Sequence, residues 1–399
     1  MAFFAAGNAA RAADKPTLKD AFKDDFFVGV AINRTIAVNA AVTADNVNRN
    51  MEQVQKDIAL TKEQFNQISP ENDLKWALIQ PYEGPNGYDF APADAFVDFG
   101  VKNNMYIVGH TLVWHSQTPG WVFGASNAPP PEGWSPGQPA ARGRGGFGGG
   151  GFGRGRGAGG PSATREQLLE RMRDHIMTVV GRYKGKIKVW DVVNEAIADG
   201  GTNILRDSPW SRIIGPDFIA KAFEYAHEAD PDAILRYNDY SLENAGKRRK
   251  LITLIKQLQA EGVPVHAIGS QTHVSVSGPS FEEEDRVLTE LETLGLPIHI
   301  TELDVNGARG GQRNRGADIS TAAAAAQGGL VSEADKRLAD AYAGLFRAFI
   351  KHKEHVKVVT FWGINDGVSW LRGAAPLLFD ANDEPKPAFD AVIRVATER

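Results

Sequence analysis

Between residues 26 and 397, the sequence alternates eight times between a short apolar run and a longer amphipathic segment. The apolar runs are almost continuously hydrophobic, which is typical of parallel strands that are buried on both faces. They predict strands at Phe26–Asn33, Phe65–Asn72, Met105–Trp114, Ile187–Asn194, Ala233–Asp239, His266–His273, Pro297–Val305 and Val356–Asn365. The amphipathic segments predict helices at residues 46–60, 92–103, 165–183, 217–229, 247–260, 281–294, 332–351 and 387–397. Eight such units favour a single closed (β/α)8 barrel of the α/β class, a TIM barrel.

An open doubly wound sheet fits less well, because the turn after Asn33 lacks a glycine-rich phosphate fingerprint. Two stretches interrupt the alternation, at residues 124–162 after the third strand and 306–330 after the seventh. Within the first, Arg142–Gly160 contains twelve glycines and four arginines, a composition that predicts a disordered loop. Both insertions follow a strand, so we expect them on the catalytic face of the barrel.

The amino terminus predicts a tail over residues 1–18, ahead of a catalytic domain over residues 19–399. Ala10, Arg11 and Ala12 are similar to the cleavage site of a secretory signal, although no complete apolar region precedes them. This remnant predicts a secreted or periplasmic protein.

Overall composition excludes several classes of protein. The chain has no cysteine, which rules out disulfides, thiolate nucleophiles and cysteine-based zinc sites. Its formal net charge of −5 does not favour binding to nucleic acid or to a membrane surface. No apolar run approaches the roughly 18 residues of a membrane span. We expect a monomer without a cofactor.

Polar and aromatic residues gather at the carboxyl ends of the predicted strands, where barrels of this kind hold their chemistry. They are Glu71, Asn72, His110, Trp114, Asn194, Glu195, Asn238, Asp239, Gln271, His273, Glu302, Asp304, Trp362, Asn365 and Asp366. The sequence has no HExxH motif or repeated histidine spacing, so we predict no metal site. Amides and carboxylates can hydrogen-bond hydroxyl groups, and indoles can stack on sugar rings. These residues therefore suit a neutral polyhydroxylated ligand.

Two of these residues, Glu195 and Glu302, end the fourth and seventh strands. In an eight-stranded barrel they are three strands apart, so their side chains face each other across the mouth. Two opposed carboxyls are the minimum apparatus for hydrolysis of a glycoside, with one protonated as the acid and the other ionised.

Several motifs carry a resemblance to glycoside hydrolase family 10, the retaining endo-β-1,4-xylanases. These motifs are ENDLKW (71–76), GHTLVWHSQTP (109–119), RMRDHI (171–176), WDVVNEA (190–196), YND (237–239), GSQTH (269–273), ITELD (300–304) and WGINDGVSW (362–370). They occur in the family's order from about Lys19 to the end of the chain. The resemblance implies xylan and xylo-oligosaccharides as partners, without nucleic acid, membrane or metal.

The resemblance also implies roles for individual residues. Glu195 matches the general acid/base and Glu302 the nucleophile of a retaining reaction, which uses a covalent intermediate and carboxyls about 5–5.5 Å apart. His273 matches the histidine that hydrogen-bonds the nucleophile, Asp304 the acid behind it, and Asn194 the amide that binds the sugar 2-hydroxyl. Residues that match the lining of the glycone subsites are Glu71, Asn72, Lys75, His110, Trp114, Gln271, Trp362 and Trp370. Tyr240 is expected to stack on the leaving-group side.

Other functions stay open at this point. The same barrel and carboxyl pair would serve a broader β-1,4-glycanase or a cellobiosidase, because the residues that cap the sugar decide between them. A polysaccharide or nucleic-acid binder that uses the barrel as a scaffold is a further alternative, suggested by the Arg/Gly segment. Four arginines in an acidic chain supply little affinity for phosphate, which disfavours the nucleic-acid version.

Overall fold

The computed structural model describes residues 16–42, 47–137, 162–307 and 332–398. Eight parallel strands close into a barrel in the order β6-β5-β4-β3-β2-β1-β9-β8, and the circle is completed by the pairing of β6 with β8. The strands are β1 (Phe27–Ile32), β2 (Gln67–Pro70), β3 (Tyr106–Trp114), β4 (Val189–Asn194), β5 (Ile234–Asp239), β6 (Ala267–Ser270), β8 (Ile298–Asn306) and β9 (Val356–Phe361). A ninth short strand, β7 (His273–Ser275), pairs with the far end of β8. The predicted (β/α)8 barrel is confirmed.

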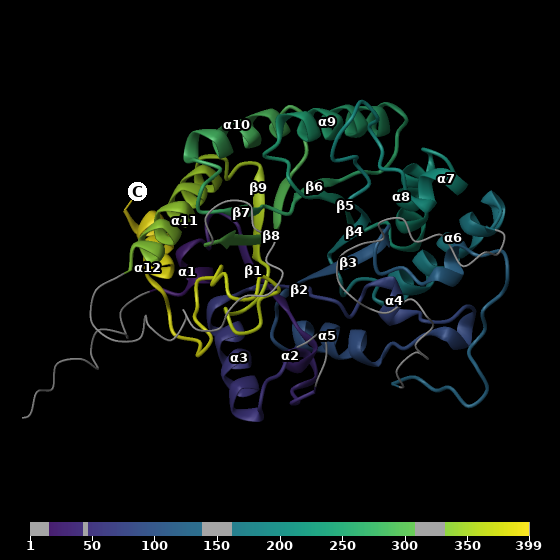
Figure 1. The fold of residues 1–399 in the computed structure, drawn as a ribbon, viewed down its shortest axis with the longest axis horizontal. Coiled ribbons are helices and arrows are strands. Elements are labelled where there is room, and N and C mark those ends of the chain that lie inside the picture. Colours follow the sequence, from purple (N-terminus) through teal and green to yellow (C-terminus); the bar gives the residue numbers. More distant parts are fainter. Residues whose placement is uncertain (1–15, 43–46, 138–161, 308–331, 399) are drawn as a thin grey trace, which may run out of the picture.

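Helices surround the strands on all sides, as Figure 1 shows. Those that follow barrel strands are α3 (Met51–Gln64), α5 (Ala91–Lys102), α6 (Arg165–Arg182), α8 (Phe218–Ala229), α9 (Ala245–Ala260), α10 (Phe281–Glu292), α11 (Glu333–Lys351) and α12 (Pro387–Thr397). Shorter helices are α1 (Leu18–Ala21), α2 (Arg34–Val38), α4 (Trp76–Ile79) and α7 (Pro209–Ile213), with 3-10 turns at Pro85–Gly87 and Gly120–Phe123. Capping boxes begin α3, α6 and α10, so side chains satisfy backbone N–H groups that the first turn leaves open.

The sixth predicted strand is divided. Residues 266–273 were expected to form one strand, but β6 ends at Ser270 and β7 begins at His273. Between them, Thr272 has a φ of 55°, in the left-handed region, which interrupts the extended backbone. The first half of β8 pairs with β6 and its second half pairs with β7.

The predicted tail and insertions lie largely outside the described residues. Leu18, which we assigned to the tail, is fully buried and begins α1. The insertion over residues 124–162 leaves and rejoins the barrel at one place, because Gly124 and Ser162 form an antiparallel bridge. The Arg142–Gly160 segment and most of the 306–330 loop fall outside the described ranges. In the part that the structure describes, no helix is long and apolar enough to cross a membrane.

Close packing between two neighbouring strands requires a glycine in β3. A Cβ on Gly109 would lie 2.3 Å from Cε3 of Trp190, whose ring is fully buried in β4. We therefore expect Gly109→Ala to destabilise the fold by about 1–3 kcal/mol, the usual cost of overpacking a core. The midpoint of thermal unfolding measures this.

Gly181 is the matched control, because it lies in α6 and a Cβ there would meet no atom within 4 Å. Gly181→Ala should leave stability unchanged or raise it by roughly 0.5–1 kcal/mol, through the helix propensity of alanine. Equal unfolding midpoints for the two variants would contradict the packing argument.

Candidate active site

Glu195 follows the last residue of β4 and has a φ of 58°, an uncommon left-handed conformation for a residue with a side chain. Two neutral donors hold its carboxyl group. Nε1 of Trp114 donates to Oε2 at 2.9 Å, and Nε2 of Gln271 donates to Oε1 at 3.0 Å. The residue is half-buried, so it stays partly accessible to solvent.

Glu302 lies on β8 and is 6% exposed. Nδ2 of Asn238 donates to its Oε1 at 2.8 Å, and Nε2 of His273 lies 3.2 Å from its Oε2. The pairing of β8 with β9 shifts register between Ile300 and Leu303, so Glu302 sits in an irregular part of the strand. Such irregularities commonly re-aim side chains next to active sites.

A continuous chain of side-chain amides joins the two glutamates. Nε2 of Gln271 donates both to Glu195 and, at 3.2 Å, to Oδ1 of Asn194. Nδ2 of Asn238 donates to the same Oδ1 at 2.9 Å and to Glu302. Each amide nitrogen thus uses both of its hydrogens. The oxygen of Asn194 is occupied by two donors, so its own NH2 group is the part that can face a ligand.

Charges on the Glu302 side favour an ionised carboxylate. Burial would raise the pKa of Glu302, but the hydrogen bond with His273 and the fields of His110 and His273 lower it below its usual range. Burial would lower the pKa of His273, but Asp304 and Glu302 raise it to about 10. Nδ1 of His273 lies 2.9 Å from Oδ2 of Asp304. The raised pKa of His273 and the lowered pKa of Glu302 both favour an ion pair between the two side chains.

The buried Asp304 also binds the exposed Trp370. Nε1 of Trp370 donates to Oδ2 of Asp304 at 2.8 Å. The indole packs edge-on against the ring of His273, with 5.2 Å between the ring centroids. Trp370 is 55% exposed, whereas Asp304 is fully buried. One carboxylate oxygen therefore holds both the histidine beside Glu302 and the aromatic residue at the rim.

Beside the two glutamates, the structure brings together most of the residues expected to line the glycone subsites. Nζ of Lys75 lies 3.0 Å from Oδ1 of Asn72 and over the rings of Trp114 and Trp362, at 5.1 and 5.9 Å from their centroids. His110 packs edge-on against Trp362 at 5.4 Å. Glu71, directly after β2, is half-buried.

Tyr240 lies on the Glu195 side and is held in a charged cluster. Its hydroxyl donates to Asp199 at 2.5 Å and accepts from Nη2 of Arg206 at 2.6 Å, and Nζ of Lys247 lies 3.2 Å from the ring centroid. Nε of Arg206 in turn donates to the main-chain oxygen of Glu195 at 3.1 Å. The cluster fixes the loop beside Glu195.

A buried ionic network supports the floor of the site. Arg236 makes two hydrogen bonds with Asp191, at 2.6 and 2.9 Å, and lies 3.0 Å from Nδ1 of His299. Nδ1 of His110 lies 3.0 Å from Oδ2 of Asp191. Burial would raise the pKa of Asp191, but Arg236 and His110 lower it to about 2. Asp191 and His299 are thus satisfied core groups.

Sequence reasoning gave no role to Asn238 or Arg206. Asn238 was among the strand-end residues, so its position in the ring was visible, but its contact with both Asn194 and Glu302 depends on three strands meeting in space. Arg206 lies in the loop between β4 and α7, where no strand-end rule applies. Among the described residues, no group of three or more His, Asp or Glu side chains is arranged to hold a metal ion.

Replacing the cationic partner of Glu302 should change the pH dependence. We expect His273→Gln to raise the pKa of Glu302, because the carboxyl loses the hydrogen bond and the positive charge of the imidazolium. The carboxylate would then be lost at a higher pH as the solution is acidified, so the acidic limb of kcat/KM moves up and activity below it falls about tenfold. A pH–rate profile measures this.

The exposed His227 of α8 provides the control, since His227→Gln should leave the profile unchanged. An acidic limb that stays in place in His273→Gln would contradict the electrostatic role of His273.

The fold is a parallel barrel, and two glutamates near the carboxyl ends of its strands are each held by hydrogen bonds from neighbouring side chains. This combination defines a glycoside hydrolase of the paired-carboxyl type. The model of glycosyl hydrolase family 10 matches residues 17–395. The chain belongs to this family.

Individual relatives agree with the family assignment. The chain is 37% identical over 391 residues to an endo-1,4-beta-xylanase of Geobacillus stearothermophilus, covering 95% of this chain and 98% of that protein. It is 40% identical over 379 residues to endo-1,4-beta-xylanase A of Caldicellulosiruptor sp. (strain Rt8B.4), and spans about half (47%) of that protein's length. A crystal structure of the intracellular xylanase of Thermoanaerobacterium saccharolyticum with xylotetraose is 36% identical, with a TM-score of 0.73 over 95% of this chain and 98% of that one.

Proposed function

We propose that this protein cleaves internal β-1,4 bonds of xylan with retention of configuration, using Glu302 as nucleophile and Glu195 as acid/base. The observation that carries the proposal is the difference in environment between the two carboxyls. Glu302 is buried beside a histidine whose pKa is raised to about 10, whereas Glu195 receives only neutral donors and stays accessible. Family membership and the xylanase names of the relatives support the substrate.

In the first step, an oxygen of ionised Glu302 forms a bond to the anomeric carbon of the sugar. The bond from that carbon to the glycosidic oxygen breaks, and the proton of Glu195 passes to the departing oxygen. The sugar is then attached covalently to Glu302, and Glu195 is left as a carboxylate. The donors on Glu195, Trp114 and Gln271, hold the carboxyl on the leaving-group side.

In the second step, Glu195 takes a proton from water, and the water oxygen forms a bond to the anomeric carbon. The ester bond to Glu302 breaks, so both carboxyls return to their initial states and the β configuration is restored. The positive charge on His273 stabilises Glu302 as it leaves. The NH2 group of Asn194, freed for ligand by the two donors on its oxygen, is placed to bind the 2-hydroxyl of the sugar.

Trp362 and Trp370 supply the preference for xylose over glucose in this proposal. Their indoles flank His273 at 6.4 and 5.2 Å, beside the nucleophile, where they would cap the sugar at the cleavage point. A cap of this kind leaves little room for a C6 hydroxymethyl group. Rejecting an added group by packing alone is usually incomplete, so weak cleavage of β-1,4-glucan is compatible with the proposal.

The substrate, reaction and stereochemistry are tested together by a proton NMR time course. Linear xylo-oligosaccharides and cello-oligosaccharides are incubated with the protein in parallel tubes. Early release of the β-anomer from the xylo series supports a retaining xylanase, and early α-anomer excludes retention. Comparable cleavage of both series would instead identify a broader β-1,4-glycanase, and a folded protein that cleaves neither would leave the binding alternatives.

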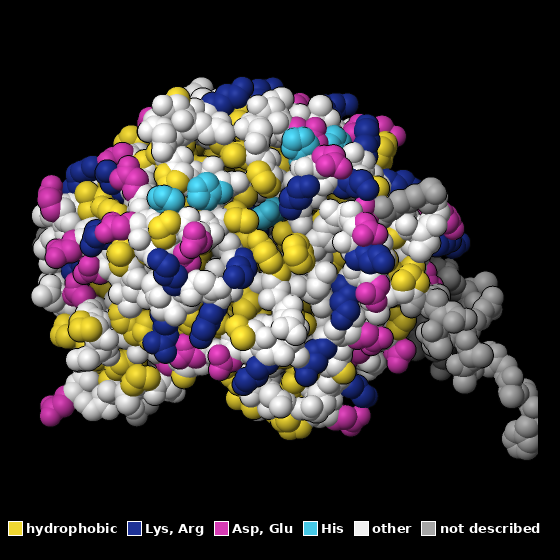
Figure 2. Space-filling view, turned by 180° about the vertical axis from the view of Figure 1, so that it is seen from behind, with side chains coloured by type: hydrophobic (Ala, Val, Ile, Leu, Met, Phe, Trp, Pro, Cys, Tyr) yellow, Lys and Arg dark blue, Asp and Glu magenta, His cyan; other side chains and the backbone are white. Residues whose placement is uncertain are grey.

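Export and a monomeric state are further proposals. Export rests on Ala10–Ala12 in a segment outside the described residues, and one relative is described as intracellular. Western blotting of cell and culture fractions tests the first, and light scattering the second. Nucleic-acid binding has little support, because acidic and basic side chains both occur across the face shown in Figure 2.

A further inference from the structure

The amide of Asn238 occupies a central place between the two catalytic strands. It is fully buried, and its nitrogen donates to both Glu302 and Asn194. Its oxygen accepts a hydrogen bond from Oγ1 of Thr301 at 2.7 Å. All three polar positions of the amide are therefore used by groups of the site.

The contacts determine which way the amide points. A reversed amide would place its oxygen against Oε1 of Glu302 and Oδ1 of Asn194, both of which are acceptors, and this juxtaposition is repulsive. Thr301 is only 2% exposed, and its hydroxyl supplies the donor that the amide oxygen needs in the observed orientation. A buried amide oxygen without a donor would carry the full cost of its lost hydration.

An irregularity in β8 makes this contact possible. Successive side chains of a regular strand point to opposite faces, yet the consecutive residues Thr301 and Glu302 both contact Asn238. The register shift between Ile300 and Leu303 lies at these two residues, and such a shift re-aims a side chain. The hydroxyl and the carboxyl therefore reach opposite ends of one amide.

The neighbouring strand leaves space for the amide. A Cβ on Gly269 of β6 would lie 2.3 Å from Oδ1 of Asn238 and 3.0 Å from Cγ2 of Thr301. Only glycine fits there without moving the amide or the threonine. Two residues therefore position the amide of Asn238. Gly269 leaves space for it because it has no side chain, and Thr301 donates a hydrogen bond to its oxygen.

We propose that Thr301 is a positioning residue for the nucleophile, acting through the amide of Asn238, which it aims at Glu302 and Asn194. The inference rests on the proposed function and deepens it. The hydroxyl of Thr301 donates to Asn238 and to neither glutamate in the described part of the chain. Its hydroxyl fixes the donor on Glu302 and, through Asn194, the group that faces the sugar 2-hydroxyl.

The effect should appear in catalysis rather than in substrate affinity. Removing the hydroxyl loosens the donor that stabilises the carboxylate of Glu302. The ionisable groups that act on the pKa of Glu302 are His273, His110 and Asp191. Glu195 lies at the other end of the amide chain. Thr301→Val leaves all four in place. We therefore expect the acidic limb of the pH profile to move upward by less than in His273→Gln.

The experiment compares Thr301→Val, which keeps the shape of the side chain, with Thr301→Ser, which keeps the hydroxyl. With an aryl β-xylobioside, kcat of Thr301→Val should fall about tenfold, below the roughly 100-fold loss for removing a direct donor. KM should change less than about threefold, and the acidic limb should rise. Thr301→Ser should recover kcat to within about threefold of the wild type.

Thr360→Val is a matched control for losing a buried threonine hydroxyl. Thr360 is also 2% exposed, and its Oγ1 also donates at 2.7 Å to a side-chain amide oxygen, that of Gln67. Among the described residues, no hydrogen bond joins Thr360 or Gln67 to either glutamate. The control should lower the unfolding midpoint as much as Thr301→Val does, while kcat and the pH profile stay unchanged.

Wild-type kcat and an unmoved acidic limb in Thr301→Val would overturn the inference, and would leave the xylanase function standing. Equal loss of kcat in Thr301→Val and Thr360→Val would also overturn it, because the effect would then be general destabilisation. Thr301→Ala carries the same test if the valine variant does not fold, as judged by circular dichroism. An inactive wild type would refute the proposed function itself.

Discussion

Glu302→Ala is expected to lose hydrolysis of xylan by roughly 10⁴–10⁶-fold, the loss that follows removal of a covalent nucleophile. The fold should persist, because the variant removes a buried carboxylate and leaves His273 and Asp304 as an ion pair. Initial rates on xylan and the circular dichroism spectrum of the variant measure the two parts of this prediction.

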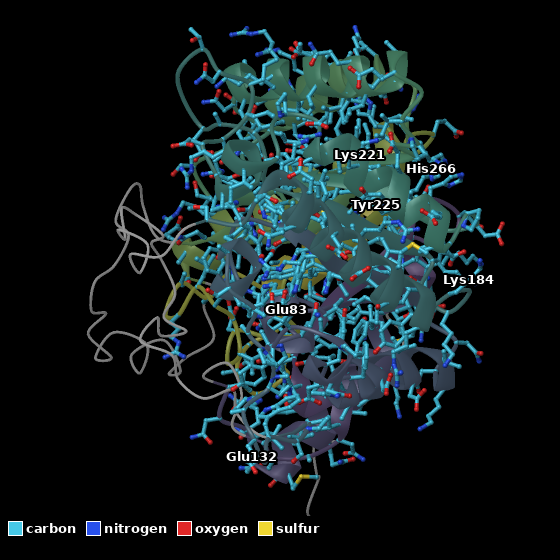
Figure 3. The ribbon with its side chains drawn as sticks, turned by 90° about the vertical axis from the view of Figure 1, so that its right-hand side faces the viewer. Glu83, Glu132, Lys184, Lys221, Tyr225 and His266 are labelled. Carbon is cyan, nitrogen blue, oxygen red and sulfur yellow. The ribbon has the colours of Figure 1, made fainter. Side chains whose placement is uncertain are left out.

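Rescue by azide identifies the role of Glu302 independently of the rate. In the cavity left by the carboxylate, azide would attack the anomeric carbon of an activated aryl β-xylobioside from the nucleophile's side. The product would be the α-xylobiosyl azide, with inverted configuration. Glu224→Ala is the control, on the outer helix α8 that carries Lys221 and Tyr225 in Figure 3. Full activity of Glu302→Ala on xylan would disprove the assignment.

Glu195→Ala should separate substrates by the quality of their leaving group. On xylan, whose leaving sugar needs a proton, kcat/KM should fall about 10²–10⁴-fold, the usual contribution of a general acid. On a dinitrophenyl β-xylobioside, whose leaving group needs no proton, kcat/KM should change less than about tenfold. Loss of the base in the second step should let the covalent intermediate accumulate, which appears as a burst of phenolate.

The stereochemistry of azide rescue distinguishes this variant from the first. Glu302 still forms the α-linked intermediate in Glu195→Ala, so azide would attack from the opposite side and give the β-xylobiosyl azide. An equal loss of kcat/KM on xylan and on the dinitrophenyl substrate would contradict the acid role of Glu195.

The barrel could be predicted from the sequence because the same pattern, an apolar run followed by an amphipathic segment, occurs eight times. Each buried parallel strand is a nearly continuous apolar run, and each is followed by an amphipathic helix, so an error in one boundary leaves the count of units unchanged. The strand-end rule singled out Glu195, Gln271 and Glu302, which the structure joins through side-chain amides, although Glu302 lies within β8 and not at its end.

What escaped prediction depends on local departures from regular geometry. The left-handed backbone at Glu195 and Thr272, and the register shift around Thr301, have no signature in hydrophobic periodicity. Thr301 would be assigned to the opposite face from Glu302 by strict alternation. Asn238 was located but its function was not, because a contact shared by three strands follows from closure of the barrel.

In the proposed function, Trp370 caps the sugar, and its hydrogen bond to Asp304 would then link substrate choice to reactivity. Enlarging the sugar site by exchanging this indole for a smaller side chain would also withdraw a donor from the carboxylate that supports His273. An engineer seeking a broader glycanase should therefore keep a donor at position 370, or make room at Trp362 instead. A substitution of Trp370 that removes the donor is therefore expected to change breadth of substrate and speed of turnover together.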